Sequence, residues 1–73
     1  MQVIMIENLT KNLKNLRKGS GETQMEVATK LGVALVTYQA YEQGKVVPSL
    51  ENFIKLADIF DVSLDYLVGR KEY

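Results

Sequence analysis

The chain has 73 residues, with nine basic and nine acidic side chains and a formal net charge of zero. A chain of this length folds as one domain around a small core, and because it contains neither cysteine nor histidine it has no disulfide, no thiolate metal site and no imidazole to act as a general base. We therefore expect neither an enzyme nor a bound metal or cofactor.

The first predicted helix covers residues 7–18 and is preceded by a short N-terminal arm, residues 1–6. Two glycines, at positions 19 and 21, end this helix. The apolar part of the arm is too short for a signal peptide, and no segment approaches the roughly 20 apolar residues that span a bilayer. We therefore expect a cytoplasmic protein without membrane contact. The helix is recognised by apolar side chains that recur every three or four positions, namely Ile6, Leu9, Leu13 and Leu16.

The second predicted helix carries the clearest start signal in the chain. Thr23 and Glu26 match a capping box, in which each side chain bonds to the other residue's backbone N–H. Gly32 ends this helix, and the third predicted helix follows over residues 35–43. Ala34 offers no capping hydroxyl, which weakens the start of that helix by about 1 kcal/mol. Two short helices joined by a tight glycine turn form the helix-turn-helix pattern.

Two further helices complete the predicted fold. Ser49 caps a strongly apolar helix over residues 50–60, and Asp61 is expected to take the left-handed position after it. Ser63 caps a short fifth helix over residues 64–68, which a glycine closes.

The predicted fold is an all-α, compact five-helix bundle over residues 7–69, followed by a C-terminal tail of residues 70–73. Tyr38 and Tyr41 are expected to be largely buried, with their hydroxyl groups at the edge of the core. The predicted core consists of Leu13, Leu16, Val27, Ala28, Leu31, Val33, Tyr38, Tyr41, Leu50, Ile54, Leu56, Ala57, Leu64 and Leu67.

Four side chains of the third helix face outward, where a major groove would lie: Leu35, Val36, Gln39 and Ala40. Three of them lack hydrogen-bonding groups and can touch only thymine methyl groups, so specificity would depend on methyl contacts, on Gln39 and on DNA shape. A second interpretation stays open. An apolar face made by Leu35, Val36, Ala40, Val46 and Val47 would suit a non-enzymatic protein–protein interaction module.

Motifs along residues 8–69 resemble the Cro/CI-type helix-turn-helix repressors of phages and bacteria. They include Leu13-Lys-Asn-Leu-Arg17, Thr23-Gln24-Met-Glu-Val27-Ala28, Lys30-Leu-Gly-Val33, Tyr41-Glu42-Gln-Gly44-Lys45, Pro48-Ser49-Leu50 and Val62-Ser63-Leu64-Asp65-Tyr66-Leu67. The resemblance implies a lambda-repressor-like fold and a sequence-specific transcriptional regulator, a repressor, with no small-molecule substrate. The chain departs from that pattern at the apolar outward positions of the third helix, at Val46 and Val47 in the loop, and at Glu22, where the family carries an apolar residue.

The resemblance also implies roles for individual residues. Gln24 opens the second helix and would contact a DNA phosphate, which suits the free N–H groups of a helix N-terminus. We expect three further phosphate contacts, from Thr37, Gln43 and Lys45. The resemblance pairs Arg17 with Glu42 as a structural ion pair that fixes the third helix to the first.

The expected partner is double-stranded DNA with an inverted repeat, bound by a homodimer. Two copies double the number of phosphate contacts and match a palindromic site with half-sites about one helical turn apart. The resemblance places the pairing near the fifth helix and the tail, at Tyr66, Val68 and Tyr73. The apolar N-terminal arm is a competing surface.

Overall fold

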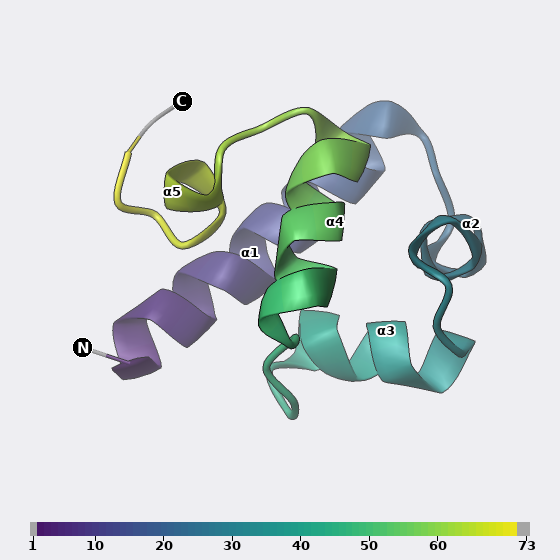
Figure 1. Ribbon diagram of the computed structural model, residues 1–73, viewed down its shortest axis with the longest axis horizontal. Coiled ribbons are helices and arrows are strands. Elements are labelled where there is room, and N and C mark those ends of the chain that lie inside the picture. Colours follow the sequence, from purple (N-terminus) through teal and green to yellow (C-terminus); the bar gives the residue numbers. More distant parts are fainter. Residues whose placement is uncertain (1, 72–73) are drawn as a thin grey trace.

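The computed structural model describes residues 2–71. Its helices run over Gln2–Ser20 (α1), Gln24–Leu31 (α2), Leu35–Gln43 (α3), Leu50–Phe60 (α4) and Leu64–Leu67 (α5). The described residues contain no strand, so the predicted all-α bundle of five helices is confirmed. In Figure 1, α4 stands at the centre in front of α1, with α2 and α3 on one side and α5 on the other.

The first helix begins earlier than its apolar pattern indicated. We expected an arm over residues 1–6, but α1 starts at Gln2. The prediction of an arm was therefore wrong for residues 2–6, and residue 1 lies outside the described part of the chain. The physical reason is tertiary contact. Met5 and Ile6 are half-buried and line one apolar hollow together with Val68, and partial burial of apolar side chains against the rest of the molecule stabilises a helix end.

The two helices of the helix-turn-helix begin and end as their sequence signals predicted. The capping box of α2 is present in full, with Thr23 and Glu26 bonded to each other's backbone N–H groups. Gly32 follows in a left-handed conformation with φ of 81°, which a glycine adopts without strain. Helix α3 covers the predicted residues 35–43, and Ala34 makes no side-chain cap.

Helices α4 and α5 also start at their predicted caps. The hydroxyl groups of Ser49 and Ser63 each accept a hydrogen bond from a backbone N–H three residues later. Asp61 takes the left-handed position predicted for it, with φ of 54°. Helix α5 ends at Leu67, one residue earlier than predicted.

The buried core is smaller than the predicted one. Leu50 is 69% exposed, and Ile54 and Leu64 are exposed as well, so their assignment to the core was wrong. Leu16 and Val33 are only half-buried against its edge. Helix α4 has a polar side that carries Glu51, Lys55 and Asp58, but its apolar side is wider than the surface that the neighbouring helices cover, and Leu50 and Ile54 lie outside the covered part. Leu64 is the first residue of the four-residue helix α5. The core residues are Leu9, Leu13, Val27, Ala28, Leu31, Tyr38, Tyr41, Leu56, Ala57 and Leu67.

The two tyrosines of α3 fix that helix to the rest of the molecule. Tyr38 is fully buried and Tyr41 is buried beside it, with ring centroids 6.4 Å apart and ring planes at 79°. The Tyr41 hydroxyl accepts a hydrogen bond from the Asn52 amide of α4 at 3.2 Å. The Tyr38 hydroxyl does not reach the edge of the core, contrary to expectation, because it donates to the buried carboxylate of Glu42.

Two asparagines of α1 hold the short α5 in place. The Asn12 amide donates to the carbonyls of Tyr66 and Leu67 at 2.9 and 3.1 Å, and the Asn8 amide donates to the carbonyl of Val68 at 3.3 Å. Backbone N–H groups after the helix bond to the carbonyls of Leu64, Asp65 and Tyr66, and the two asparagines supply donors to the carbonyls of Leu67 and Val68 that follow. Side chains more than fifty positions away in the sequence therefore complete the end of α5.

Candidate nucleic-acid interface

The turn between α2 and α3 is tight because its backbone groups bond back onto α2. The N–H groups of Gly32 and Val33 both donate to the Ala28 carbonyl, at 2.9 and 3.0 Å. Ala28 itself is fully buried, and its small side chain leaves room for α3 to pass close to α2. The result is the helix-turn-helix pair at one end of the molecule in Figure 1, with one side of α3 against the core.

The outward side of α3 carries the four residues predicted to face DNA bases. Val36 is 70% exposed, and Leu35, Gln39 and Ala40 are half-buried beside it. The exposed apolar surface at these positions is therefore mainly that of Val36, while Gln39 contributes the one polar group of the four.

Three of the residues predicted to hold phosphates lie on α2 and α3, and the fourth, Lys45, follows the end of α3. Gln24 is the first residue of α2 and is half-buried, and Thr37 is half-buried in the first turn of α3. Gln43 and Lys45 are exposed at the opposite end of α3. The Lys45 backbone N–H donates to the Ala40 carbonyl at 3.0 Å, which fixes the chain where α3 ends.

An ion pair between α1 and α3 lies behind this surface. The Arg17 Nε and Nη2 groups donate to the two carboxylate oxygens of Glu42 at 2.7 and 3.2 Å, so the pair predicted from the resemblance is brought together in bidentate geometry. Glu42 is only 2% exposed. A planar, doubly bonded guanidinium fixes orientation as well as distance, and so it fixes α3 relative to α1.

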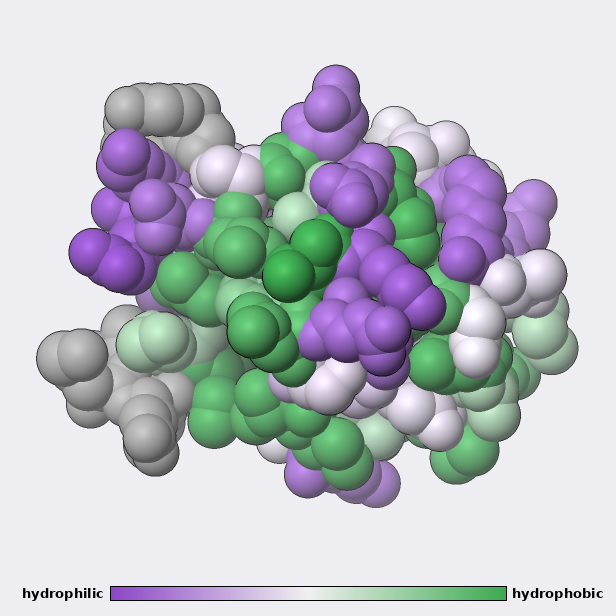
Figure 2. Space-filling view, in the orientation of Figure 1, coloured by the Kyte–Doolittle hydropathy of each residue, from purple (hydrophilic) through white to green (hydrophobic). Residues whose placement is uncertain are grey.

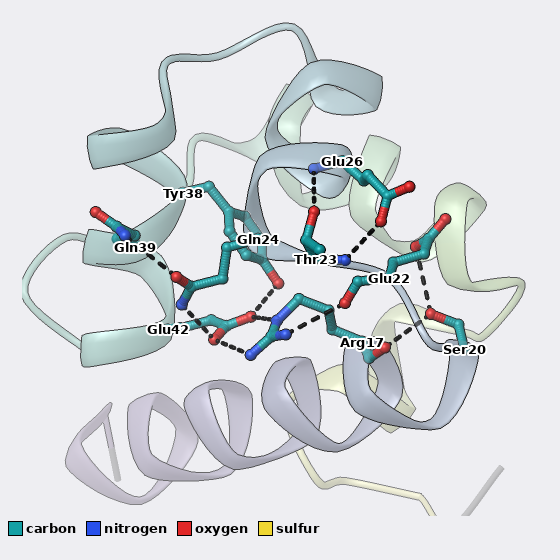
Figure 3. A network of polar contacts seen from close by, with 9 residues as sticks. All are labelled: Arg17, Ser20, Glu22, Thr23, Gln24, Glu26, Tyr38, Gln39 and Glu42. Carbon is teal, nitrogen blue, oxygen red and sulfur yellow. Dashed lines mark hydrogen bonds and ion pairs between the residues drawn. The ribbon is translucent and has the colours of Figure 1, made fainter.

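Glu42 is the centre of a larger network, shown in Figure 3. Its carboxylate also accepts hydrogen bonds from the Tyr38 hydroxyl and from the Gln24 amide, the latter at 3.1 Å. Burial raises the pKa of Glu42, but the hydrogen bonds from Arg17, Tyr38 and Gln24 outweigh it and hold that pKa below its ordinary value. Glu42 is therefore an ionised carboxylate at neutral pH, with charge-assisted bonds to three helices.

The hydrogen-bond network extends beyond Glu42, because Gln24 also bonds to Gln39 on the outward side of α3. The Gln39 amide nitrogen donates to the Gln24 amide oxygen at 3.2 Å. Sequence reasoning gave Gln24 a phosphate contact and Gln39 a place facing bases, but missed the bond between them. No local pattern reveals it, because the two residues lie on different helices and meet only when the turn closes.

Glu22, which replaces an apolar residue of the family pattern, has partners of its own in the structure. Its carboxylate pairs with Lys30 of α2 and accepts a hydrogen bond from the Ser20 hydroxyl at 3.3 Å. Its backbone carbonyl accepts a bond from Arg17 at 3.3 Å. The departure from the family pattern is thus accommodated at the surface beside the ion pair.

An apolar hollow of about 310 Å³ lies on another part of the molecule, between α1, α4 and the end of α5. Figure 2 shows apolar side chains gathered along the side of α4 that faces α5 and over the loop before α4, next to a band of polar side chains. The hollow brings together Val68 and the N-terminal residues Met5 and Ile6, which the sequence had suggested as rival dimer surfaces. Tyr66 is half-buried, and Tyr73 lies outside the described residues. The hollow is lined by Met5, Ile6, Leu9, Val47, Pro48, Phe53 and Val68.

Residues 2–71 contain no group of acidic side chains arranged to hold a metal ion. In the same part of the chain, no helix combines the length and apolarity needed to cross a bilayer.

Comparison with known proteins gives a consistent result. A family model described as helix-turn-helix matches residues 13–67. The chain is 39% identical over 62 residues to the cryptic phage CTXphi transcriptional repressor RstR of Vibrio cholerae, an overlap of 85% of this chain and 55% of that protein. Two regulators of Bacillus subtilis are also similar. ImmR is 37% identical over 65 residues (89% of this chain, 51% of ImmR) and AnsR is 43% identical over 60 residues (82% and 52%).

The chain spans about half the length of the curated relatives it matches. No solved structure gives a significant match.

Proposed function

Because the chain belongs to the Cro/CI-type family of helix-turn-helix proteins, we propose that it is a cytoplasmic, sequence-specific DNA-binding regulator of transcription that acts as a repressor. One observation carries the proposal above all: α3 is fixed from behind by Tyr38, Tyr41 and Glu42, while its opposite side stays open. A rigid helix with one free side is what insertion into a major groove requires. Similarity to a protein named as a transcriptional repressor supports the direction of regulation.

In this mechanism α3 lies in the major groove, and bound protein blocks access of polymerase to a promoter. The side chains facing the bases are Leu35, Val36, Gln39 and Ala40. Phosphates on either side are held by Gln24, Thr37, Gln43 and Lys45. Phosphate contacts fix the position of the protein on the duplex, and base contacts select the sequence. The chemistry is binding alone, so the proposal needs no cofactor and no small-molecule substrate.

We further propose that the protein binds an inverted repeat as a homodimer. A domain with a formal net charge of zero holds DNA weakly as a single copy, and a second copy doubles the phosphate contacts. The apolar hollow supports this proposal, because Val68 and the N-terminal end of α1 form one surface there. An apolar surface of this kind is typical of a protein interface.

A second candidate function rests on the exposed valines of α3 and the following loop. Val36, Val46 and Val47 are 70%, 51% and 58% exposed, which also suits an apolar protein partner. Val47 additionally lines the hollow between α1 and α4. Under this alternative the protein keeps the helix-turn-helix fold but uses the face of α3 to bind a protein.

Selection of bound duplexes from a random pool at moderate salt tests the two functions. Enrichment of an inverted repeat with T-rich steps supports the regulator, whereas weak, salt-sensitive binding without enrichment supports the interaction module. The variant Leu35→Arg with Val36→Ser separates them further, since it should preserve or strengthen DNA affinity but break an apolar protein contact. Lys45→Ala should weaken binding to all sequences and reduce the salt slope by about 1.

Sedimentation at micromolar concentration, with and without the selected duplex, tests the dimer. Val47→Asp places a charge in the hollow and should shift the protein to monomer. Val46→Asp is the matched control, because Val46 is similarly exposed but does not line the hollow. A wild-type protein that stays monomeric on DNA would contradict the proposed homodimer but not the proposed DNA binding.

A further inference from the structure

We propose that Gln39 selects an adenine in each half-site, and that buried Glu42, acting through Gln24, fixes the orientation of the Gln39 amide. The inference rests on the proposed function, and it adds the base that is read and the way the reading group is positioned. Gln39 is the specificity-determining residue, and Gln24 is a positioning residue. Figure 3 shows the three side chains in a row from the buried pair to the outward side of α3.

The first step is the chemistry of Glu42. An ionised carboxylate accepts hydrogen bonds and donates none. Both Glu42 oxygens already accept hydrogen bonds from Arg17. The pKa of the Glu42 carboxyl lies below its ordinary value, because the hydrogen bonds to the carboxylate outweigh the effect of burial. Whichever group of Gln24 faces Glu42 must therefore be a donor. The Gln24 amide nitrogen takes that place at 3.1 Å.

The second step follows from the shape of an amide. With its nitrogen held by Glu42, Gln24 must direct its oxygen the other way, toward Gln39. That oxygen is again only an acceptor, so Gln39 must present its nitrogen in turn, as it does at 3.2 Å. The polarity of two amides is thus set in sequence by one buried charge. A 180° flip of either amide would bring oxygen against oxygen or nitrogen against nitrogen.

The third step is what remains free on Gln39. One N–H is used by Gln24, which leaves its amide oxygen and its second N–H for a ligand. This adjacent acceptor and donor matches the major-groove edge of adenine, where N6 donates and N7 accepts. Guanine offers two acceptors there and thymine offers an acceptor and a methyl group, so both leave the Gln39 oxygen without a donor.

The neighbours of Gln39 sharpen the expectation. Leu35, Val36 and Ala40 carry no polar group that reads a base. Preference for adenine should therefore fall on one base pair of each half-site, with only methyl and shape preferences around it. A glutamine whose amide is not held could turn it either way and bind several bases. By holding the Gln39 amide in one orientation, Gln24 adds discrimination between bases.

The experiment compares duplex selection and affinities for three glutamine-to-methionine variants, which keep side-chain length and remove the amide. Wild type should prefer adenine over guanine at one position of each half-site by about 5- to 150-fold, the range for a bidentate base contact. Gln39→Met should remove that preference and leave the other positions unchanged. Gln24→Met should reduce the same preference severalfold. Gln43→Met is the matched control, because Gln43 lies on α3 outside the network and should weaken all sequences equally.

A measurement without DNA accompanies the selection. In NMR spectra of the free protein, Gln24→Met should move the side-chain amide resonances of Gln39 and speed its exchange with solvent, while Gln43→Met should not. Variants are compared only after thermal unfolding shows that they are folded.

The outcomes separate the two levels of the argument. If wild type enriches no sequence, the proposed function fails, and this inference fails with it. If wild type enriches an inverted repeat but Gln39→Met retains every preference, adenine reading alone is overturned. If Gln24→Met weakens all sequences equally and leaves the Gln39 resonances unchanged, Gln24 acts only through the phosphate contact of the proposed function, and its positioning role is overturned.

Discussion

Arg17→Met should be among the most destabilising single changes in this domain. The substitution keeps much of the apolar stem but removes both hydrogen bonds from the guanidinium to Glu42, at 2.7 and 3.2 Å. Glu42 is 2% exposed, so water cannot replace them. Leaving one charge of a buried pair without its partner costs about 3–5 kcal/mol.

This cost is large for so small a protein. At roughly 0.05–0.15 kcal/mol per residue, a domain of this length has a total stability of about 4–11 kcal/mol. Each kcal/mol lowers the Tm of a domain of this size by about 4–8 °C, so we expect a decrease of about 12 °C or more. Thermal and urea unfolding followed by helical circular dichroism measure it. A loss below about 1 kcal/mol would refute the reasoning, because it would place the pair in the range of exposed ion pairs.

The pH dependence gives an independent check on the cause. In the wild type the pKa of Glu42 is below its ordinary value of 4.5, because the hydrogen bonds to the carboxylate outweigh its burial. The pair's contribution to the free energy of unfolding is therefore complete above the ordinary pKa and is lost as pH falls through the lower pKa of the folded state. In Arg17→Met the hydrogen bonds from Arg17 no longer oppose the effect of burial, so the pKa of Glu42 in the folded state rises. The stability difference between the two proteins should then grow from pH 4 to pH 7.

A double variant separates the cost of an unpaired charge from the loss of packing. Arg17→Met with Glu42→Met leaves no buried charge, so it should recover part of the stability lost in the single variant. Recovery stays incomplete, because the Tyr38 hydroxyl and the Gln24 amide lose their acceptor. A double variant less stable than either single variant would show that the side chains act mainly through packing.

The remaining predictions concern helix ends and use the same unfolding measurement. Ala34→Ser supplies the missing cap at the start of α3 and should add about 1 kcal/mol; an unchanged midpoint would contradict this. Gly69→Ala should cost more than Gly21→Ala, since both have positive φ but only the first would bring a methyl group to 2.5 Å from the Asn8 amide. Equal losses would show that Asn8 moves aside freely. Asn12→Ala removes two hydrogen bonds to the end of α5 and should cost about 1–3 kcal/mol, and a smaller loss would show that water replaces them.

The sequence determined most where the chemistry is local. The capping box of Thr23 and Glu26 joins residues three apart, and the left-handed positions of Gly32 and Asp61 depend on a residue's own backbone preference. Such signals need no knowledge of the rest of the chain. They were sufficient to place the ends of α2, α3 and α4, and with them the helix-turn-helix and the outward face of α3.

Only the tertiary structure decided which apolar side chains are covered. Leu50 and Leu56 belong to the same apolar helix, yet one is exposed and the other fully buried. Hydrophobicity reports that a side chain favours burial, but a small domain has too few helices to cover every one. The early start of α1 has the same origin, since Met5 and Ile6 are half-buried beside a hollow that they line together with Val68 from the far end of the chain.

The candidate site divides in the same way. Sequence and family resemblance proposed Gln24 and Gln39 separately, because each occupies a recognisable position on its own helix. Their bond to each other, and through Gln24 to Glu42, spans residues on two helices. The direction in which an amide points is set by its nearest donors and acceptors, and these are known only after the helices have packed. The positions of the site were thus open to prediction, while the polarity of its one polar base-facing group was decided by the fold.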